Sequence, residues 1–251
     1  MLKVEIYGVK IEEKVAPGFN LAKAIVEGAS KVAGGLRDGD VVVVTSKVVS
    51  KAEGRVVELS SVQPSRFAES LARVVNKPPE LVELILREST GIVRMKRGML
   101  ITRDLRGWVS ANSGVDQSNA PLGHAVLLPS DPDASARRLR EEIMKLTGRR
   151  VAVIISDTQG RPFRRGQVDV AIGVAGMGPI RDRRGELDLY GYRLRVKETA
   201  IADELASAAE LVIGQAAEGV PVAIIRGVVY EGDERAGAKE LQRPEEEDLF
   251  L

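Results

Sequence analysis

A chain of 251 residues, 44% of them hydrophobic and 29% charged, is long enough to bury a sizeable core. Its 37 lysines and arginines nearly cancel its 36 aspartates and glutamates, so no overall field attracts nucleic acid or a membrane. The absence of cysteine excludes disulfides and cysteine-ligated metals, and a single histidine, His124, argues against a multi-histidine metal site or a Ser–His–Asp triad. Any acid–base or metal chemistry would therefore rest on carboxylates, lysines and hydroxyls.

The opening residues predict no export or membrane signal. Residues 1–14 (MLKVEIYGVKIEEK) have no long apolar core, so we expect neither a signal peptide nor a membrane anchor. The longest apolar runs elsewhere in the chain have only the length of strands. We therefore expect a cytoplasmic protein whose partners include neither nucleic acid nor a membrane.

Hydrophobic spacing predicts the elements of the first half of the chain. Residues 3–11 alternate as a strand does, residues 20–32 have the spacing of a helix, and residues 41–44 read as a buried strand. A second helix begins at Pro64-Ser65, and its expected apolar face consists of Phe67, Leu71, Val74 and Val75. Another helix follows Pro78-Pro79, with Leu81, Leu84 and Ile85 on its apolar side.

The second half of the chain mixes strands and helices without a steady rhythm. Residues 91–111 predict a hairpin or two short strands, and a helix runs from residues 131–133 to Gly148. A strand at 151–155, a helix at 199–212, a strand at 221–229 and a charged, peripheral tail follow. The pattern favours an α+β fold with mixed or antiparallel sheets and packed helices. We expect one domain over residues 1–251, with two intertwined α+β subdomains as an alternative.

The first candidate site lies in residues 151–166, VAVIISDTQGRPFRRG. Asp157 and Thr158 follow the apolar run and offer the hard oxygen ligands that Mg²⁺ or Mn²⁺ prefers. Arg161 and Arg164 have the fork geometry that suits phosphate or carboxylate. Together they fit a metal-bound phosphate. They fit equally an Asp–Arg turn closed by its own ion pair.

Two further segments could contribute to such a site. In residues 111–119 (ANSGVDQSN), Asp116 could complete a metal site with Asp157, although an Asx-rich turn explains that segment better by itself. In residues 44–55 (VTSKVVSKAEGR), lysines follow a buried strand where they could bind phosphate, but the spacing is not that of a Walker A loop. Such lysines are more often a solvated surface.

A fourth segment, residues 213–220 (IGQAAEGV), separates a helix from the last strand. Gly214 permits a close approach of the backbone to a ligand, and Gln215 and Glu218 add oxygen atoms. A helix C-cap followed by a turn explains the segment better when it is considered alone.

Taken together, these motifs resemble one family. The ordered set GDVVVVTSKVVSKAEGR, LILREST, SGVDQSN, LLPSDPDASA, VAVIISDTQGRPFRRG, AIGVAG and ADELASAAELVIGQ, between about residues 3 and 230, resembles the coenzyme F420-0:L-glutamate ligases, or gamma-glutamyl ligases. The resemblance implies a homodimeric α+β enzyme that uses GTP to add one or more L-glutamates to coenzyme F420-0. It also implies two divalent ions, Mg²⁺ or Mn²⁺, with K⁺ as a further candidate.

The resemblance also assigns roles to residues of this chain. The positions that match metal ligands are Asp116, Asp157, Thr158 and Gln215. The positions that match nucleotide contacts are Glu12, Glu13, Lys14, Val15, Ser46, Lys47, Lys51, Asn119, Gly214 and Glu218. The chain departs from the family where relatives often read GDDL and YGREL, because it has GFNL at 18–21 and YGYRL at 190–194.

The residue inventory suits acyl-phosphate chemistry. A carboxylate does not condense with an amine unless it is activated, and phosphoryl transfer from GTP would activate it through positioning and charge neutralisation. Lys51, Arg161 and Arg164 are the candidates that would neutralise the phosphates, and the sequence singles out no general base. Two alternatives remain: a nucleotide- or phosphate-binding protein without turnover, and a metal-dependent phosphohydrolase.

Overall fold

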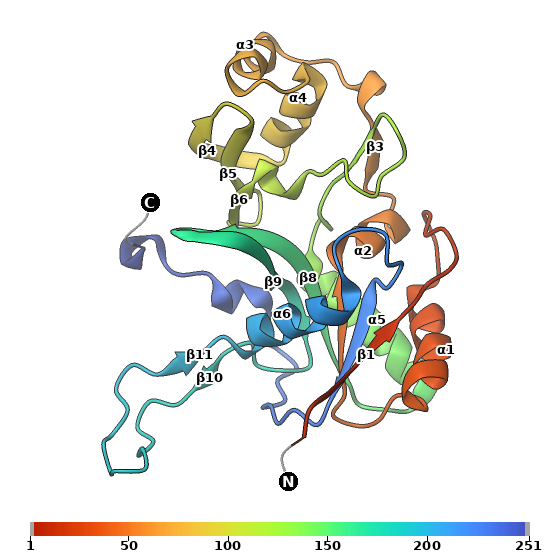
Figure 1. Ribbon diagram of the computed structural model, residues 1–251, viewed down its shortest axis with the longest axis vertical. Coiled ribbons are helices and arrows are strands. Elements are labelled where there is room, and N and C mark those ends of the chain that lie inside the picture. Colours follow the sequence, from red (N-terminus) through yellow and green to blue (C-terminus); the bar gives the residue numbers. More distant parts are fainter. Residues whose placement is uncertain (1–2, 249–251) are drawn as a thin grey trace.

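A computed structural model describes residues 3–248 and centres on a five-stranded sheet (Figure 1). In spatial order its strands are β1 (Glu5–Val9), β12 (Val222–Arg226), β2 (Val41–Thr45), β8 (Ala152–Arg161) and β9 (Arg164–Ala175). The central pair β2–β8 is parallel, and the other neighbouring pairs are antiparallel. The mixed sheet and its packed helices confirm the predicted α+β class.

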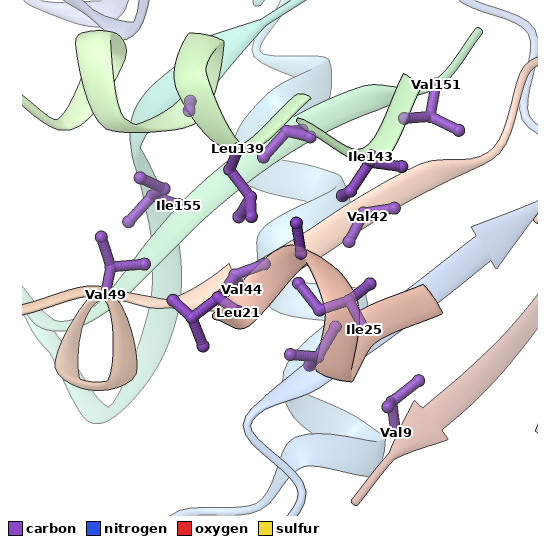
Figure 2. Packing of buried hydrophobic residues seen from close by; sticks show 14 of the residues in the cluster. Val9, Leu21, Ile25, Val42, Val44, Val49, Leu139, Ile143, Val151 and Ile155 are labelled. Carbon is purple, nitrogen blue, oxygen red and sulfur yellow. The ribbon is translucent and has the colours of Figure 1, made fainter. Parts of the chain in front are cut away.

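Alternation along the central strands gives the sheet two apolar faces. Val42 and Val44 face α1 (Leu21–Ala33), α2 (Ser46–Ala52) and α5 (Pro132–Thr147), as the cluster in Figure 2 shows. Val41 and Val43 face the opposite way, toward α6 (Ile201–Ile213). All four valines are fully buried. Burying one such side chain stabilises the folded state by roughly 1.5–3 kcal/mol.

Local capping explains where the helices begin and end. The side chains of Asn20, Ser65 and Asp131 accept hydrogen bonds from backbone N–H groups in the first turns of α1, α3 (Arg66–Val75) and α5. Each such cap stabilises its helix by about 1 kcal/mol. Gly34 and Gly148 end α1 and α5 in the left-handed conformation that glycine adopts without strain. These helices occur where their spacing predicts them.

A second packing unit lies beside the main sheet (Figure 1). Helices α3 and α4 (Pro79–Arg87) pack together and against Leu100 of the sheet formed by β4 (Ser89–Lys96), β5 (Met99–Asp104) and β6 (Val109–Ala111). The prediction of a hairpin or two strands at 91–111 therefore missed one strand.

The predicted apolar face of α3 is half wrong. Phe67 and Val74 are 60% and 56% exposed, whereas the buried face consists of Ala68, Leu71, Ala72 and Val75. Spacings of three and four residues starting from Ala68 select this face. The two alanines are only weakly hydrophobic. The prediction therefore followed the larger Phe67 and placed the apolar face on the adjacent side of the helix.

The strand predicted at 151–155 is also too short. The structure continues it as β8 to Arg161, where a tight connection leads into β9. Asp157 therefore lies within a strand and not at its end. Its neighbour β2 stops at Thr45, which pairs with Ser156, so beyond that point β8 pairs only with β9. This difference in strand length leaves open space beside β8.

Shorter elements complete the described chain. Strand β3 (Val56–Glu58) pairs with β7 (His124–Val126), and β10 (Arg181–Asp182) with β11 (Glu198–Thr199), at the base of an arm that projects from the body (Figure 1). The tail to residue 248 is largely exposed, and residues 249–251 of the predicted tail lie outside the described range. Within residues 3–248, no helix has the length and apolar character needed to cross a membrane. One domain over 1–251 stays a prediction.

Candidate active site

A cavity of about 340 Å³ opens where β2 ends beside β8. Its wall comes from the segment after β1, the β2–α2 junction, β8 and β9, and the loop between α6 and β12. The wall includes these predicted site residues: Glu13, Lys14, Val15, Ser46, Lys47, Lys51, Asn119, Asp157, Thr158, Gly214, Gln215 and Glu218. Segments more than a hundred residues apart in sequence therefore meet at one edge of the sheet.

Both faces of β8 supply side chains to this cavity. Asp157 continues the series that includes Val153 and Ile155, which faces α1, α2 and α5. Ser156 and Thr158 continue the series of Ile154, which faces α6. Because β2 has already ended, the cavity reaches both series of side chains.

Asp157 lies partly buried against the start of α2. The Ser46 hydroxyl donates a hydrogen bond to Asp157 Oδ1 at 2.6 Å. The pKa of Asp157 is raised to about 7, chiefly by burial; the hydrogen bond from Ser46 and the charge of Lys47 oppose this rise, and the negative charges of Asp169 and Asp116 add to it. A carboxylate in this position releases its proton readily when a cation arrives.

Lys47 and Lys51 lie one helical turn apart on α2 and both line the cavity. Lys47 Nζ forms an ion pair with Asp116 Oδ2 at 2.7 Å. The pKa of Lys51 is lowered by burial and then by the charge of Lys47. These lysines are partly buried, so the interpretation as a solvated surface does not describe them.

Asp116 is held by its backbone and by its side chain. Its N–H and C=O exchange hydrogen bonds with Val126, and its carboxylate accepts hydrogen bonds from the Ser118 N–H and hydroxyl. Burial raises the pKa of Asp116, but the hydrogen bonds from Lys47 and Ser118 outweigh that effect and lower it below its usual value. The Asx turn that the sequence suggested for this segment is present. The same carboxylate also pairs with Lys47 of the cavity wall.

The loop after α6 forms the opposite rim. Gly214 ends the helix at φ +74°, and a Cβ there would lie 2.4 Å from the side chain of Glu218, so the position requires glycine. The Glu218 carboxylate accepts a hydrogen bond from the Ala216 N–H, and Asn119 donates one to the Ala216 carbonyl. The helix-cap interpretation of this segment is therefore correct, and the segment also borders the cavity.

Sequence reasoning missed two acidic residues behind this rim, Asp169 and Glu210. Asp169 on β9 is 2% exposed and lines the cavity, and its carboxylate accepts hydrogen bonds from Ser156, Thr158 and Gln215. Glu210 on α6 accepts a hydrogen bond from the same Gln215 amide at 2.8 Å. The sequence does hold one indication of Asp169, an aspartate between valines in the apolar run VDVAIGVA. Burying an unpaired carboxylate there would cost free energy, so polar partners could have been expected.

Comparison with known proteins adds the decisive observation. Residues 8–227 match the model of the family described as F420-0:Gamma-glutamyl ligase. The chain belongs to this family. It is 48% identical over 252 residues to "Coenzyme F420:L-glutamate ligase" of Methanopyrus kandleri, with 98% of this chain and 97% of the relative covered.

Other members of the F420-0:gamma-glutamyl ligase family show the same extent of similarity. The protein of the same name from Methanothermobacter thermautotrophicus is 47% identical over 249 residues, covering 98% of each chain. The one from Archaeoglobus fulgidus is 41% identical over 249 residues, covering 99% of this chain and 97% of the relative. The similarity extends over nearly the full length of each protein.

The structure places four predicted site residues of this family member outside the cavity wall: Glu12, Arg161, Arg164 and Asp116, whose carboxylate is paired with Lys47 of the wall. Glu12 is exposed beside it. Arg161 and Arg164 pair at the tip of the β8–β9 hairpin, where the Arg161 guanidinium donates to the Arg165 carbonyl. Neither arginine forms an ion pair with Asp157, so the Asp–Arg turn is not formed.

The cavity residues fit a hard divalent cation. Within residues 3–248, no group of three or more histidine, cysteine, aspartate or glutamate side chains could hold a metal. The predicted metal ligands offer oxygen atoms of mixed type: the Asp157 carboxylate, Thr158 hydroxyl and Gln215 amide oxygen of the cavity wall, and the carboxylate of Asp116, which is paired with Lys47 of that wall. Mg²⁺ typically binds to one or two carboxylates and completes its coordination with water and substrate phosphate oxygens, which matches this set.

Proposed function

We propose that this chain ligates L-glutamate to coenzyme F420-0 with GTP as the phosphoryl donor, releasing GDP and phosphate. The observation that carries the proposal is the identity of 48% over nearly the whole length to a protein named coenzyme F420:L-glutamate ligase. The cavity supports it, because acidic and lysine side chains converge there from segments distant in the sequence. The product carries one or more glutamates, γ-linked after the first.

The lysines on α2 give the proposed reaction its phosphate-binding groups. Lys47 and Lys51 face the cavity from the same side of one short helix. Their charges hold the triphosphate while the γ-phosphoryl group moves to the carboxylate of the coenzyme. The resulting acyl phosphate has phosphate as its leaving group, so the amine of glutamate displaces it and forms the amide. The remaining nucleotide contacts come from Glu12–Val15, Ser46, Asn119, Gly214 and Glu218.

Two divalent ions, Mg²⁺ or Mn²⁺, would be held by Asp116, Asp157, Thr158 and Gln215. When bound, they neutralise the negative charge that accumulates on the phosphates during transfer. Asp116 would exchange its ion pair with Lys47 for a cation, which frees the lysine for phosphate. We include K⁺ as a further cation, to be tested by its omission from the assay.

We further propose that the enzyme acts as a homodimer. The arm between β10 and β11 exposes Leu189 completely and Tyr190 to 98%, and Val196 is 87% exposed. Apolar side chains gathered on a projecting arm indicate a surface that another chain covers. Sedimentation velocity should report a dimer, and the double substitution Leu189→Ser with Tyr190→Ser should shift it toward monomer. A wild-type monomer at micromolar concentration would contradict this proposal.

The direct test of the activity is incubation with GTP, Mn²⁺, L-glutamate and coenzyme F420-0, analysed by mass spectrometry. We expect the coenzyme to gain the mass of one or more glutamyl residues and GDP to form in step with it. GTP hydrolysis at the same rate without glutamate or coenzyme would instead indicate a phosphohydrolase. Nucleotide binding without any turnover would indicate a binding protein.

A further inference from the structure

Asp169 occupies a central position in the polar network behind the cavity. Its Oδ2 accepts a hydrogen bond from the Ser156 hydroxyl at 2.9 Å, and its Oδ1 accepts one from the Thr158 hydroxyl at 2.8 Å and one from Gln215 Nε2 at 3.1 Å. Thr158 and Asp169 are directly opposite each other in the β8–β9 register. An ionised carboxylate can only accept hydrogen bonds, so all three neighbours must direct their protons toward it.

The Thr158 hydroxyl has a single proton, and the acceptor that takes this proton determines where the lone pairs of the oxygen point. This hydroxyl lies 2.8 Å from Asp169 Oδ1 and 3.1 Å from Gln215 Oε1. The charged acceptor at the shorter distance takes that proton. The lone pairs of the threonine oxygen then remain free for another ligand.

The amide of Gln215 is oriented in the same way. Its NH₂ group donates to Asp169 Oδ1 and to Glu210 Oε1, at 3.1 and 2.8 Å. With both protons committed to carboxylates, the amide cannot be reversed without setting its oxygen against two negative charges. Gln215 Oε1 is therefore held beside Thr158 Oγ1, and both oxygens belong to residues of the cavity wall.

We propose that Asp169 is a positioning residue that turns the oxygens of Thr158 and Gln215 toward a divalent cation in the cavity. The inference rests on the proposed function, because it concerns the cation of that reaction. Carboxylates that orient the ligands of a metal in this way typically change its affinity 10- to 100-fold when they are altered. In this proposal Asp169 acts through Thr158 and Gln215, whose two hydrogen bonds engage its Oδ1, while its Oδ2 accepts one from Ser156.

The arrangement makes an unusual demand on position 215. A glutamate there would add a negative charge, which by itself would strengthen cation binding. In this network, however, it would remove the two donated protons and leave three carboxylates facing one another. We therefore expect Gln215→Glu to weaken Mn²⁺ binding, and the added substitution Asp169→Asn to recover part of the loss by supplying a donor.

The test is a titration of the purified full-length protein with Mn²⁺ alone, in which free Mn²⁺ is followed by its electron paramagnetic resonance signal. Asp169→Asn should raise the Mn²⁺ Kd about 10- to 100-fold, while kcat at saturating Mn²⁺ stays within about threefold of the wild-type value. The matched control is Asp203→Asn, because Asp203 also accepts a hydrogen bond from β9, at the Ala171 N–H, but does not line the cavity. Its Mn²⁺ affinity should not change.

Three outcomes would overturn the inference. Unchanged Mn²⁺ affinity in Asp169→Asn would show that the carboxylate does not orient the ligands. A kcat that collapses even at saturating Mn²⁺ would make Asp169 a direct participant. Tighter Mn²⁺ binding by Gln215→Glu would show that the protons donated by Gln215 do not orient its oxygen. Because Gln215 is exposed, we expect this variant to fold even if a substitution of the buried Asp169 does not. If the wild-type protein binds no Mn²⁺, the proposed metal site itself is wrong. This result is distinct from the three outcomes above, in which the metal binds but Asp169 does not position its ligands.

Discussion

The base and the tip of the β8–β9 hairpin differ sharply although a few residues separate them. At the base, Asp157, Thr158 and Asp169 line the cavity; Thr158 donates a hydrogen bond to Asp169, and Asp157 accepts one from Ser46. At the tip, Arg164 is exposed and, with Arg161, does not contribute to the cavity wall. A strand advances about 3.3 Å per residue, so the four residues from Asp157 to Arg161 span roughly 13 Å.

This difference shows that proximity in sequence is a poor guide to a shared site along an extended strand. The acidic and basic residues of SDTQGRPFRRG looked like two halves of one phosphate site. The structure instead places Asp157 against the start of α2, more than a hundred residues earlier in the chain, where Ser46 donates a hydrogen bond to it and Lys47 lines the same cavity. A helix or a tight loop would have kept the two groups together, but β8 separates them.

The largest effect should follow substitution at the base of the hairpin. Asp157→Ala removes a carboxylate of the proposed cation site, so ligation should fall by more than about 100-fold. The circular dichroism spectrum should be unchanged, because the strand pairing does not depend on this side chain. Near-normal glutamate addition, measured by mass spectrometry with Mn²⁺ present, would remove Asp157 from the account.

A smaller loss should follow substitution on the helix that faces the base. Lys47→Met removes the ion pair with Asp116 and one of the two charges proposed to bind phosphate. We expect the KM for GTP to rise roughly 10-fold, in line with the loss of an interaction with a charged group. Lys23→Met, an exposed lysine on α1, is the matched control and should leave this KM unchanged. An equal effect of both substitutions would contradict the assigned role.

The stability of the metal-free protein should reveal the cost of burying Asp157. Because folding raises the pKa of this carboxyl from 3.8 to about 7, the folded state loses stability as pH rises through that window. Asp157→Asn should therefore be more stable than the wild type at pH 8 in the presence of a chelator, by several degrees in Tm. The difference should shrink toward pH 5 and disappear below about pH 4.

The control for this experiment is Glu12→Gln, which alters an exposed carboxyl beside the cavity. Its Tm should follow the wild-type value at every pH. A difference between Asp157→Asn and the wild type that stays constant from pH 5 to pH 8 would show that the carboxyl is not strained by burial.

The smallest effect should come from the tip. Arg164→Ala alters an exposed side chain that does not line the cavity, so the Mn²⁺ affinity should change by less than about twofold. Electron paramagnetic resonance titration measures it under the conditions used for Asp169→Asn. A loss as large as that of Asp169→Asn would show that the base and the tip act as one site.

The sequence predicts the main elements well where local chemistry determines them. The helices with a side-chain cap and a glycine at their end, α1 and α5, occur where expected. The length of β8 could not be predicted, because the residues beyond Ser156, from Asp157 to Arg161, become a strand only through pairing with β9. The face of α3 was misassigned because the small residues Ala68 and Ala72 carry little hydrophobic signal compared with Phe67.

The candidate site was predictable as a set of residues but not as an arrangement. The motifs indicated Asp157, Lys47 and Gln215, and the structure places all three in the wall of one cavity. Asp169 was missed because its proposed role depends on the strand register that sets it opposite Thr158, and that register is a tertiary property. Arg161 and Arg164 were grouped with the acids because they are close in sequence. The sequence does not reveal that an extended strand carries them away from Asp157.

The central claim is that acids from distant segments converge at the end of β2 to hold a cation with the nucleotide. Crystals grown with Mn²⁺ and a non-hydrolysable GTP analogue, measured at the manganese absorption edge, test it most directly. We predict anomalous density within about 2.0–2.3 Å of a carboxylate oxygen of Asp157, with the triphosphate beside Lys47 and Lys51. Manganese and nucleotide bound together elsewhere, with the Asp157 carboxylate still bonded only to Ser46, would contradict the claim.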